Sequence, residues 1–283
     1  MRFPSIYGFL EMLWNPLVKS FVRRFFMGKR YSQILRLLDN QEFMSVSQLS
    51  QILEVSPMTI RRDLDEMESK KLIRRLHGGA AAIKTQNNEP FYRDRAVVQV
   101  DEKRLIAQIA NELVQDNSII AVDSGSTCFE LVKLLQNRPI TVVTNSFPVM
   151  EGLLYSNTVK VIVPCGNLRS HEGAISGSDT IEYLSKLHVD QFFMGVGGID
   201  SNAGITDYNI EDAAVKRIII SNASKVIVLA DSSKYNRVTF ANICPVSELD
   251  ILVSDSKPAG KLYENLQRSG VQIITPSEAK EDR

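Results

Sequence analysis

Several residue types that mark particular classes of protein are scarce in this sequence of 283 residues. The three cysteines, Cys128, Cys165 and Cys244, lie far apart and form no Cys-x-x-Cys pair. This pattern argues against a disulfide framework and a metal site, and predicts free, buried thiols in a reducing cytoplasm. The three histidines also lack the spacing of metal ligands. We therefore expect neither a metal nor a cofactor.

A long uninterrupted apolar run is also missing. Residues 1–26 are rich in apolar and aromatic side chains, but Glu11, Asn15-Pro16 and Lys19 interrupt them before ~20 clean apolar residues accumulate. No small-residue cleavage site follows an apolar core, which argues against a signal peptide. We expect residues 1–28 to be a poorly ordered or amphipathic extension, or the result of an over-long start assignment, on a cytoplasmic protein that enters no membrane.

A net charge is absent too, because 33 Lys and Arg residues balance 33 Asp and Glu residues. The balance conceals an asymmetry between the two parts of the chain. Residues 1–88 carry 14 basic against 8 acidic side chains, whereas the remainder carries 19 against 25. A basic N-terminal part beside an acidic remainder indicates that nucleic acid meets only the front of the molecule.

Residues 45–82 have the pattern of two short helices followed by a basic ribbon. Leu49, Ile52 and Leu53 follow helical spacing and are expected to be buried. The pair Ser56-Pro57 then suits the N-cap and the first position of a second helix. An earlier helix is expected over residues 31–40, with a core stripe at positions 34, 37 and 38.

The second helix of this segment is expected to bury Ile60, Leu64 and Met67 on one face and to present its N-terminal half to a DNA major groove. The run LIRRLHGGA that follows is typical of a short basic strand with a Gly-Gly turn, as in the wing of a winged helix. Exposed arginines are ordinarily solvated surface, and a helical hairpin alone is weak evidence. The capped start, the paired arginines and the basic ribbon together favour DNA binding.

The run SPMTIRRDLDEM followed by LIRRLHGGA resembles the signature of the DeoR family of bacterial transcriptional regulators, from Tyr31 to about Ile83. The resemblance implies a winged helix-turn-helix domain, assigned to residues 29–84, that binds double-stranded operator DNA. The candidate DNA-binding residues are Ser56, Pro57, Met58, Thr59, Arg61, Arg62, Arg74, Arg75 and His77.

After a polar linker at residues 85–100, the sequence pattern predicts alternating strands and helices over residues 101–283. The first helix is expected to be capped by Asp101 and striped by Leu105, Ile109 and Leu113. Further strands are expected at 118–122, buried on both faces, and at 140–144, 159–163, 191–196, 225–229, 250–254 and 271–275, with helices after Pro148 and at 179–187, 210–221 and 258–269. This alternation predicts a mostly parallel, Rossmann-like α/β sheet.

Polar residues follow several of these strands, at the sheet edge where open α/β folds bind ligands. The loop Asp123-Ser124-Gly125-Ser126-Thr127 leads directly into a helix, so hydroxyl groups and a helix N-terminus could hold a phosphate or another small anion. Ser, Thr and Gly also form ordinary helix caps, so this alternative stays open. The candidate effector-binding residues are Asp123, Ser124, Gly125, Ser126, Thr127, Asn145, Gly166, Arg169, Gly197, Gly198, Glu211, Lys216, Asp231 and Lys234.

The pieces EKRLIAQIA, DSGST, VVTNS, GNLR, GVGGID and LADSSK resemble the effector domain of DeoR-type regulators over residues 89–255. That domain is related in fold to ribose-5-phosphate isomerase, so the resemblance implies a phosphorylated sugar as effector, with its phosphate on residues 123–127. Cys165 departs from the family pattern, which often has glycine there.

These features predict a repressor of a carbohydrate-metabolism operon that a phosphorylated sugar releases from its operator, and the protein is expected to be a homo-oligomer that reads paired half-sites. The alternative is that the protein activates transcription of the operon rather than repressing it. An isomerase- or deaminase-like enzyme would need an acid and a base near a sugar carbonyl, for which Asp207, Glu211 and Lys216 qualify by residue type alone. A third class of function, besides the regulator and the enzyme, is a nucleoid or scaffold protein whose sugar-binding domain is vestigial.

Overall fold

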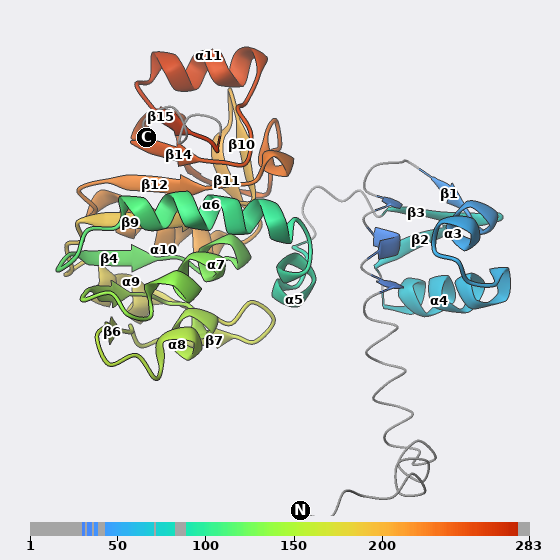
Figure 1. Cartoon of the computed structure of the whole chain (residues 1–283), viewed down its shortest axis with the longest axis horizontal. Helices are drawn as coiled ribbons and strands as arrows, with labels where there is room; N and C mark the ends of the chain where they lie inside the picture. Colours follow the sequence, from blue (N-terminus) through green and yellow to red (C-terminus); the bar gives the residue numbers. More distant parts are fainter. Residues whose placement is uncertain are drawn as a thin grey trace, which may run out of the picture. The chain divides into compact units, whose positions relative to one another are not determined.

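The computed structural model describes residues 30–31, 33–35, 37–38, 43–70, 72–82 and 89–276. The chain divides into two compact units, Met1–Thr85 and Gln86–Arg283 (Figure 1). The expected N-terminal extension at 1–28 and most of the linker before Glu89 lie outside the described residues.

The first unit is a winged helix-turn-helix. Its described residues between 30 and 38 are helical. They are followed by β1 (Met44–Ser45), α3 (Val46–Ile52), α4 (Pro57–Ser69), β2 (Ile73–Leu76) and β3 (Gly79–Ala82). The strands pair antiparallel in the order β1-β3-β2. The helix starts follow the sequence, since Ser45 and Gln48 form a capping box on α3, and Ser56 caps α4 with Pro57 at its start.

The core of this unit confirms most of the predicted helical stripes. Ile34, Leu38, Leu49 and the three predicted α4 residues are all fully buried. The expectation for Ile52 was wrong, because this residue is 54% exposed. It lies in the last turn of α3, beyond the reach of the α4 face on which Leu49 packs.

The second unit is built on a seven-stranded parallel sheet in the order β15-β14-β12-β9-β4-β5-β6. Its strands are β4 (Ile119–Val122), β5 (Thr141–Val143), β6 (Lys160–Ile162), β9 (Gln191–Gly195), β12 (Val226–Leu229), β14 (Ile251–Val253) and β15 (Gln272–Ile274). Its helices are α5 (Tyr92–Ala96), α6 (Val100–Leu113), α7 (Ser126–Leu135), α8 (Phe147–Leu153), α9 (Ser178–Leu184), α10 (Ile210–Ser221) and α11 (Gly260–Arg268).

Apolar clusters cover both faces of this sheet, as expected for a parallel α/β fold. On β9, Phe192 and Met194 face the cluster that includes α10 and α11, whereas Phe193 faces the cluster that includes α6, α7 and α8. The predicted fold class, a helix-turn-helix domain followed by an α/β domain, is thus confirmed. No helix among the described residues is long and apolar enough to cross a membrane.

Short antiparallel strands add features that the sequence pattern did not predict. β7 (Asn167–Arg169) and β8 (Ala174–Ser176) form a hairpin, and β10 (Gly198–Asp200), β11 (Gly204–Asp207) and β13 (Ala241–Cys244) form a separate sheet. Each has only three or four residues, which is too short for a period-two pattern to stand out. Two 3-10 turns, η1 (Ser232–Lys234) and η2 (Val246–Glu248), complete the unit.

Four local expectations in this unit were wrong. Asp101 does not cap α6, since Gln99 does so with φ of 52°, and Asp101 lies in the first turn. Leu105 is 43% exposed, because the buried face of α6 instead carries Ile106, Ala107, Ile109, Ala110 and Lys103. Ile119 is exposed at the start of β4, where the strand enters the sheet from its amino end. Cys165 is also exposed, unlike the other two thiols.

Candidate DNA-binding surface and effector site

Helix α4 presents its arginines to solvent because its opposite face is fixed in two ways. Apolar residues pack into the core, and the fully buried Asp63 accepts hydrogen bonds from Arg30 Nε at 2.5 Å and Nη2 at 3.0 Å. Asp63 directly follows Arg61 and Arg62, so this bidentate ion pair sets the rotation that turns both arginines outward. Met58 at the N-terminal end of α4 is also exposed.

The cap of α4 engages two of the other candidate residues. Ser56 Oγ accepts a hydrogen bond from the Thr59 N–H at 3.2 Å, and the two hydroxyl oxygens lie 2.9 Å apart. Ser56 and Thr59 therefore fix the start of the helix that carries the exposed arginines. Contact with DNA by either residue stays a prediction.

The wing places Arg74 and His77 in solvent and holds Arg75 against the protein. Arg75 Nε donates to Asp65 Oδ1 at 3.1 Å, and its Nη1 donates to the Gly79 carbonyl at 2.8 Å. Gly78 adopts φ of +79°, which favours glycine, and a Cβ on Gly79 would lie 2.1 Å from the Met44 carbonyl oxygen. The Gly-Gly turn is thus required by the wing itself.

The exposed cations of α4 and the wing form a surface suited to a polyanion. Within the described part of the chain, Arg61, Arg62 and Arg74 pair with no carboxylate. An unpaired guanidinium can bind a phosphate or the edge of a guanine base.

In the second unit, the direction of the chain across the sheet reverses between β4 and β9. The chain runs from β4 through β5 to β6 on one side, and from β9 through β12 to β15 on the other. Open α/β folds bind ligands at such a switch point, beyond the carboxyl ends of the strands. Gly125 after β4 and Gly195 at the end of β9 face each other here, since a Cβ on either would lie 3.8 Å from the Cα of the other.

The N-terminus of α7 opens at this switch point. Its N-cap residue is Gly125, which has no side chain to accept hydrogen bonds from the first-turn N–H groups. Ser124, Ser126 and Thr127 are largely buried here, and within the described residues their hydroxyl groups have no hydrogen-bond partner. Free N–H groups, free hydroxyl groups and the positive end of a ten-residue helix are suited to a phosphate.

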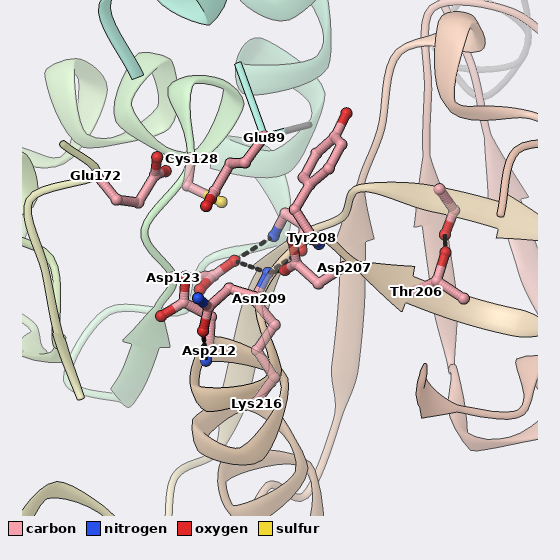
Figure 2. A network of polar contacts seen from close by, with 12 residues as sticks. Glu89, Asp123, Cys128, Glu172, Thr206, Asp207, Tyr208, Asn209, Asp212 and Lys216 are labelled. Carbon is pink, nitrogen blue, oxygen red and sulfur yellow. Dashed lines mark hydrogen bonds and ion pairs between the residues drawn. The ribbon is translucent and has the colours of Figure 1, made fainter. Parts of the chain in front are cut away.

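Lys216 on α10 ties three strand ends together beside this loop (Figure 2). Its Nζ lies 2.9 Å from Asp123 Oδ2 and 2.5 Å from Asp207 Oδ2, and donates to the Gly195 carbonyl at 2.8 Å. Asp123 Oδ2 also accepts the Gly195 N–H at 3.0 Å. Burial opposes the charge of Lys216, but the two carboxylates outweigh it and raise the pKa of this lysine. Lys216 is therefore a permanent cation whose hydrogen bonds are already used.

Two other lysines near the site, Lys103 and Lys234, have lowered pKa values, whereas the pKa of Lys216 is raised. Burial lowers the pKa of Lys234 to about 8 despite Asp231, and the neighbouring Arg237 and Arg95 lower it further. Burial also lowers the pKa of Lys103 to about 8, with Asp231 opposing and Lys234 and Arg95 contributing. The cations gathered here favour an added anion, so the buried Lys103 and the partly exposed Lys234 are candidate phosphate neighbours.

Sequence reasoning missed Lys103 and Arg95. A signal for Lys103 existed, because it lies four positions before Ala107 and shares the apolar face of α6, where a lysine is unusual. Its Nζ donates to the carbonyl groups of Arg95, at 2.5 Å, and Val98, at 2.7 Å. Nothing in the local pattern marked Arg95, whose partner Glu172 is far away in the sequence.

Arg169 on β7 forms ion pairs with two carboxylates, those of Glu89 and Asp212. Its Nη2 donates to Glu89 Oε2 at 2.6 Å, and its Nη1 pairs with Asp212. Burial raises the pKa of Asp212 to about 6, against the effect of Arg169. Glu211 accepts a hydrogen bond from the Ser176 hydroxyl at 2.6 Å. The structure thus brings the predicted Arg169 and Glu211 together through the β7–β8 hairpin.

Packing explains the other predicted glycines. A Cβ on Gly166 would lie 2.1 Å from Thr180 Oγ1, one on Gly197 would lie 2.8 Å from Thr239 Oγ1, and one on Gly198 would lie 2.2 Å from the Arg237 carbonyl oxygen. Two polar candidates also have structural partners. Asn145 Nδ2 donates to the Ile175 carbonyl group while its Oδ1 is buried with no partner among the described residues, and Asp231 caps η1.

The sequence matches two family descriptions. Residues 30–86 match the DeoR-like helix-turn-helix domain, and residues 98–256 match the DeoR C terminal sensor domain. Among solved structures, ribose 5-phosphate isomerase A of Methanocaldococcus jannaschii is similar with a TM-score of 0.37 and 20% identity, over 48% of this chain and 54% of that chain.

Regulators of known name align with nearly the whole of their own length. The glycerol-3-phosphate regulon repressor of Escherichia coli (strain K12) is 32% identical over 246 residues, which are 87% of this chain and 97% of that protein. The L-fucose operon activator of Haemophilus influenzae (strain ATCC 51907 / DSM 11121 / KW20 / Rd) is 33% identical over 242 residues, which are 86% of this chain and 96% of that protein. The chain therefore belongs to the DeoR family of transcriptional regulators, with a DNA-binding helix-turn-helix domain followed by the sensor domain of that family.

Proposed function

We propose that this regulator represses a carbohydrate-metabolism operon and leaves its operator when a phosphorylated sugar binds to the α/β unit. The observation that carries the proposal is the open N-terminus of α7, with free hydroxyl groups on Ser124, Ser126 and Thr127 at the switch point of the sheet. Lys103 lies on α6, which packs against α7, and adds positive charge together with Lys234. The named similarity to a glycerol-3-phosphate regulon repressor supports a phosphorylated effector.

The contacts of Lys216 support ligand binding without turnover. A base near a sugar carbonyl must lose its proton close to neutral pH, whereas Lys216 is held as a cation by Asp123 and Asp207. A DNA-binding domain on the same chain gives ligand binding a purpose of its own. We propose further that the α/β units assemble a homo-oligomer, so that two winged helices read paired half-sites.

A thermal-shift screen of full-length protein tests the function directly. Glycerol 3-phosphate, ribose 5-phosphate, glucose 6-phosphate and their unphosphorylated parents would each be titrated. A true effector stabilises the folded state by mass action, by about 2.7 kcal/mol at a hundredfold excess over Kd, so the melting temperature should rise with its concentration. Failure of every phosphorylated compound to shift the transition would reject the proposal.

Removing the hydroxyl groups of the anion loop should separate sensing from DNA binding. With Ser126 and Thr127 both replaced by Ala, effector affinity should fall about tenfold or more, because each lost hydroxyl group removes a hydrogen bond to a charged phosphate. Operator affinity without effector should stay unchanged. Gel-shift titration with and without effector measures both, and an undiminished response would remove this loop from the site.

Effector binding should weaken as the pH rises through 8. Lys103 and Lys234 have pKa values of about 8 in the free site, and a bound phosphate would stabilise their protonated forms. The contribution of each lysine is complete below its free pKa and is lost as the pH rises from that value through the raised pKa of the bound state, while phosphate remains a dianion over this range. Between pH 7 and pH 9, affinity should fall roughly tenfold per participating lysine. Calorimetry should also record proton uptake near pH 8.5, which Lys234→Met should reduce.

A further inference from the structure

The stretch that precedes α6, inside the predicted linker of residues 85–100, is fastened to the β7–β8 hairpin by three successive contacts. Glu89 Oε2 accepts from Arg169 Nη2 at 2.6 Å, the rings of Phe91 and His171 lie 5.0 Å apart, and Arg95 pairs with Glu172. The three contacts follow one another in the same sequence order along both segments. Residues 89–95 contribute Glu89 and Arg95 to the ion pairs, and the hairpin contributes Arg169 and Glu172. We call residues 89–95 the strap.

The hairpin side of these contacts is firmly fixed. The Asn145 side chain and backbone both bond to Ile175, and the Phe147 N–H donates to the Gly173 carbonyl at 2.6 Å. The turn itself is closed by N–H groups of Glu172 and Gly173 that donate to the Arg169 carbonyl. The hairpin is thus anchored to the ends of β5 and α8, beside the proposed effector site.

The strap side is held differently. The N–H groups of Asp94 and Arg95 donate within the strap, to the Phe91 carbonyl. Side chains make the contacts to the hairpin, and the outermost, between Glu89 and Arg169, leaves both side chains 21% exposed. The Glu89–Arg169 pair is more exposed than the Arg95–Glu172 pair, whose side chains are 16% and 3% exposed, so solvent screens it more and a competing anion opens it first.

Arg169 has two carboxylate partners that differ in their burial. Asp212 on α10 is almost fully buried, whereas Glu89 is the more exposed partner and belongs to the strap. A guanidinium binds a phosphate or carboxylate in the same bidentate manner in which it binds a glutamate. An anionic effector that reaches Arg169 would therefore compete first with Glu89.

We propose that Glu89 occupies, as an internal carboxylate, the place on Arg169 that the effector takes, so that effector binding releases the strap. The inference rests on the proposed function, since Arg169 is one of the candidate effector-binding residues. Residues 83–88 connect β3 of the wing to Glu89. Release adds the strap to this tether, and a longer tether lowers the effective concentration at which two joined DNA-binding domains meet paired half-sites.

Hydrogen exchange of full-length protein tests the strap, with Glu89→Gln as the variant and Glu264→Gln, at an exposed position on α11, as the matched control. In the absence of effector, Glu89→Gln should make amides of residues 91–96 exchange about fivefold faster, and should tighten binding of glycerol 3-phosphate or ribose 5-phosphate about fivefold. Glu264→Gln should change neither. Arg169→Gln should also speed exchange but weaken binding, which separates competition from general loosening.

The outcomes distinguish the strap from the function on which it rests. Unchanged exchange in free Glu89→Gln protein would overturn the inference whatever binds to the site. A sugar phosphate that binds wild-type protein but leaves exchange of residues 91–96 unchanged or slower would also overturn it. If none of the phosphorylated compounds of the thermal-shift screen binds the wild type, the proposed function fails and release by an effector fails with it.

Discussion

Replacing Lys216 with Met is expected to destabilise the α/β unit by about 3–5 kcal/mol, the usual result of removing one partner from a buried ion-pair cluster. Lys216 is 5% exposed and its Nζ contacts Asp123, Asp207 and the Gly195 carbonyl group. Without the ammonium group, two carboxylates would remain buried close together with no cation between them. Burial of an unpaired charge is among the most destabilising changes a single substitution can make.

Chemical denaturation of full-length protein, followed by circular dichroism, measures this effect on the unit that contains α10. The matched control is Lys225→Met, at an exposed position after the same helix, which should change stability by less than about 0.5 kcal/mol. A triple variant with Asn at positions 123 and 207 and Met at position 216 should recover part of the loss, since no charge is then left unpaired. A Lys216→Met protein as stable as wild type would show that the cluster does not hold the strand ends together.

The Lys216 cluster also shows where sequence reasoning about the site ends. The sequence marked Asp123, after a strand, and Lys216, on a helix, as candidate effector-binding residues. In the structure their side chains contact each other across 93 positions of the chain, and contact of either with an effector stays a prediction. Residue type and local spacing indicate which groups are present, but which charges pair depends on the order of β4, β9 and α10 in space.

The same distinction separates the predicted from the unpredicted parts of the fold. The α10 prediction of 210–221 agrees with the structure because its cap at Asn209 and its apolar spacing are local signals. The β7–β8 hairpin was missed, because its strands are too short to show a period-two pattern and its anchoring contacts come from Asn145 and Phe147 in another part of the chain. The strap residue Arg95 was missed for the same reason, since its role depends on Glu172 in that hairpin.

In the DNA-binding domain, two adjacent candidate arginines differ in their contacts with the rest of the protein. Arg74 and Arg75 are adjacent in the sequence, and the DeoR-like pattern assigned both to DNA. In the wing, β-strand alternation turns Arg74 to solvent and Arg75 toward Asp65 and Gly79. The alternation of side chains along the strand could be read from the sequence, but the ion pair between Arg75 and Asp65 on α4 could not.

Replacing Arg62 with Ala should reduce operator affinity about 10- to 100-fold while leaving the fold intact. Arg62 is exposed on α4, has no carboxylate partner within the described residues, and lies beside the buried Asp63 that orients the helix. Loss of a contact to a base edge costs about 1–3 kcal/mol. Alanine is a good helix former, so the thermal transition should not fall.

A gel-shift titration against a duplex selected by the wild-type protein measures this loss, and a salt series identifies its origin. If Arg62 binds a phosphate, the slope of log affinity against log salt should fall by about one, whereas a base contact leaves the slope nearly unchanged. Arg75→Ala is the matched comparison, because its guanidinium is held by Asp65 and the Gly79 carbonyl group. That variant should weaken binding less and lower the thermal stability of the wing. Equal affinity of Arg62→Ala and wild-type protein would mean that α4 does not present this residue to DNA.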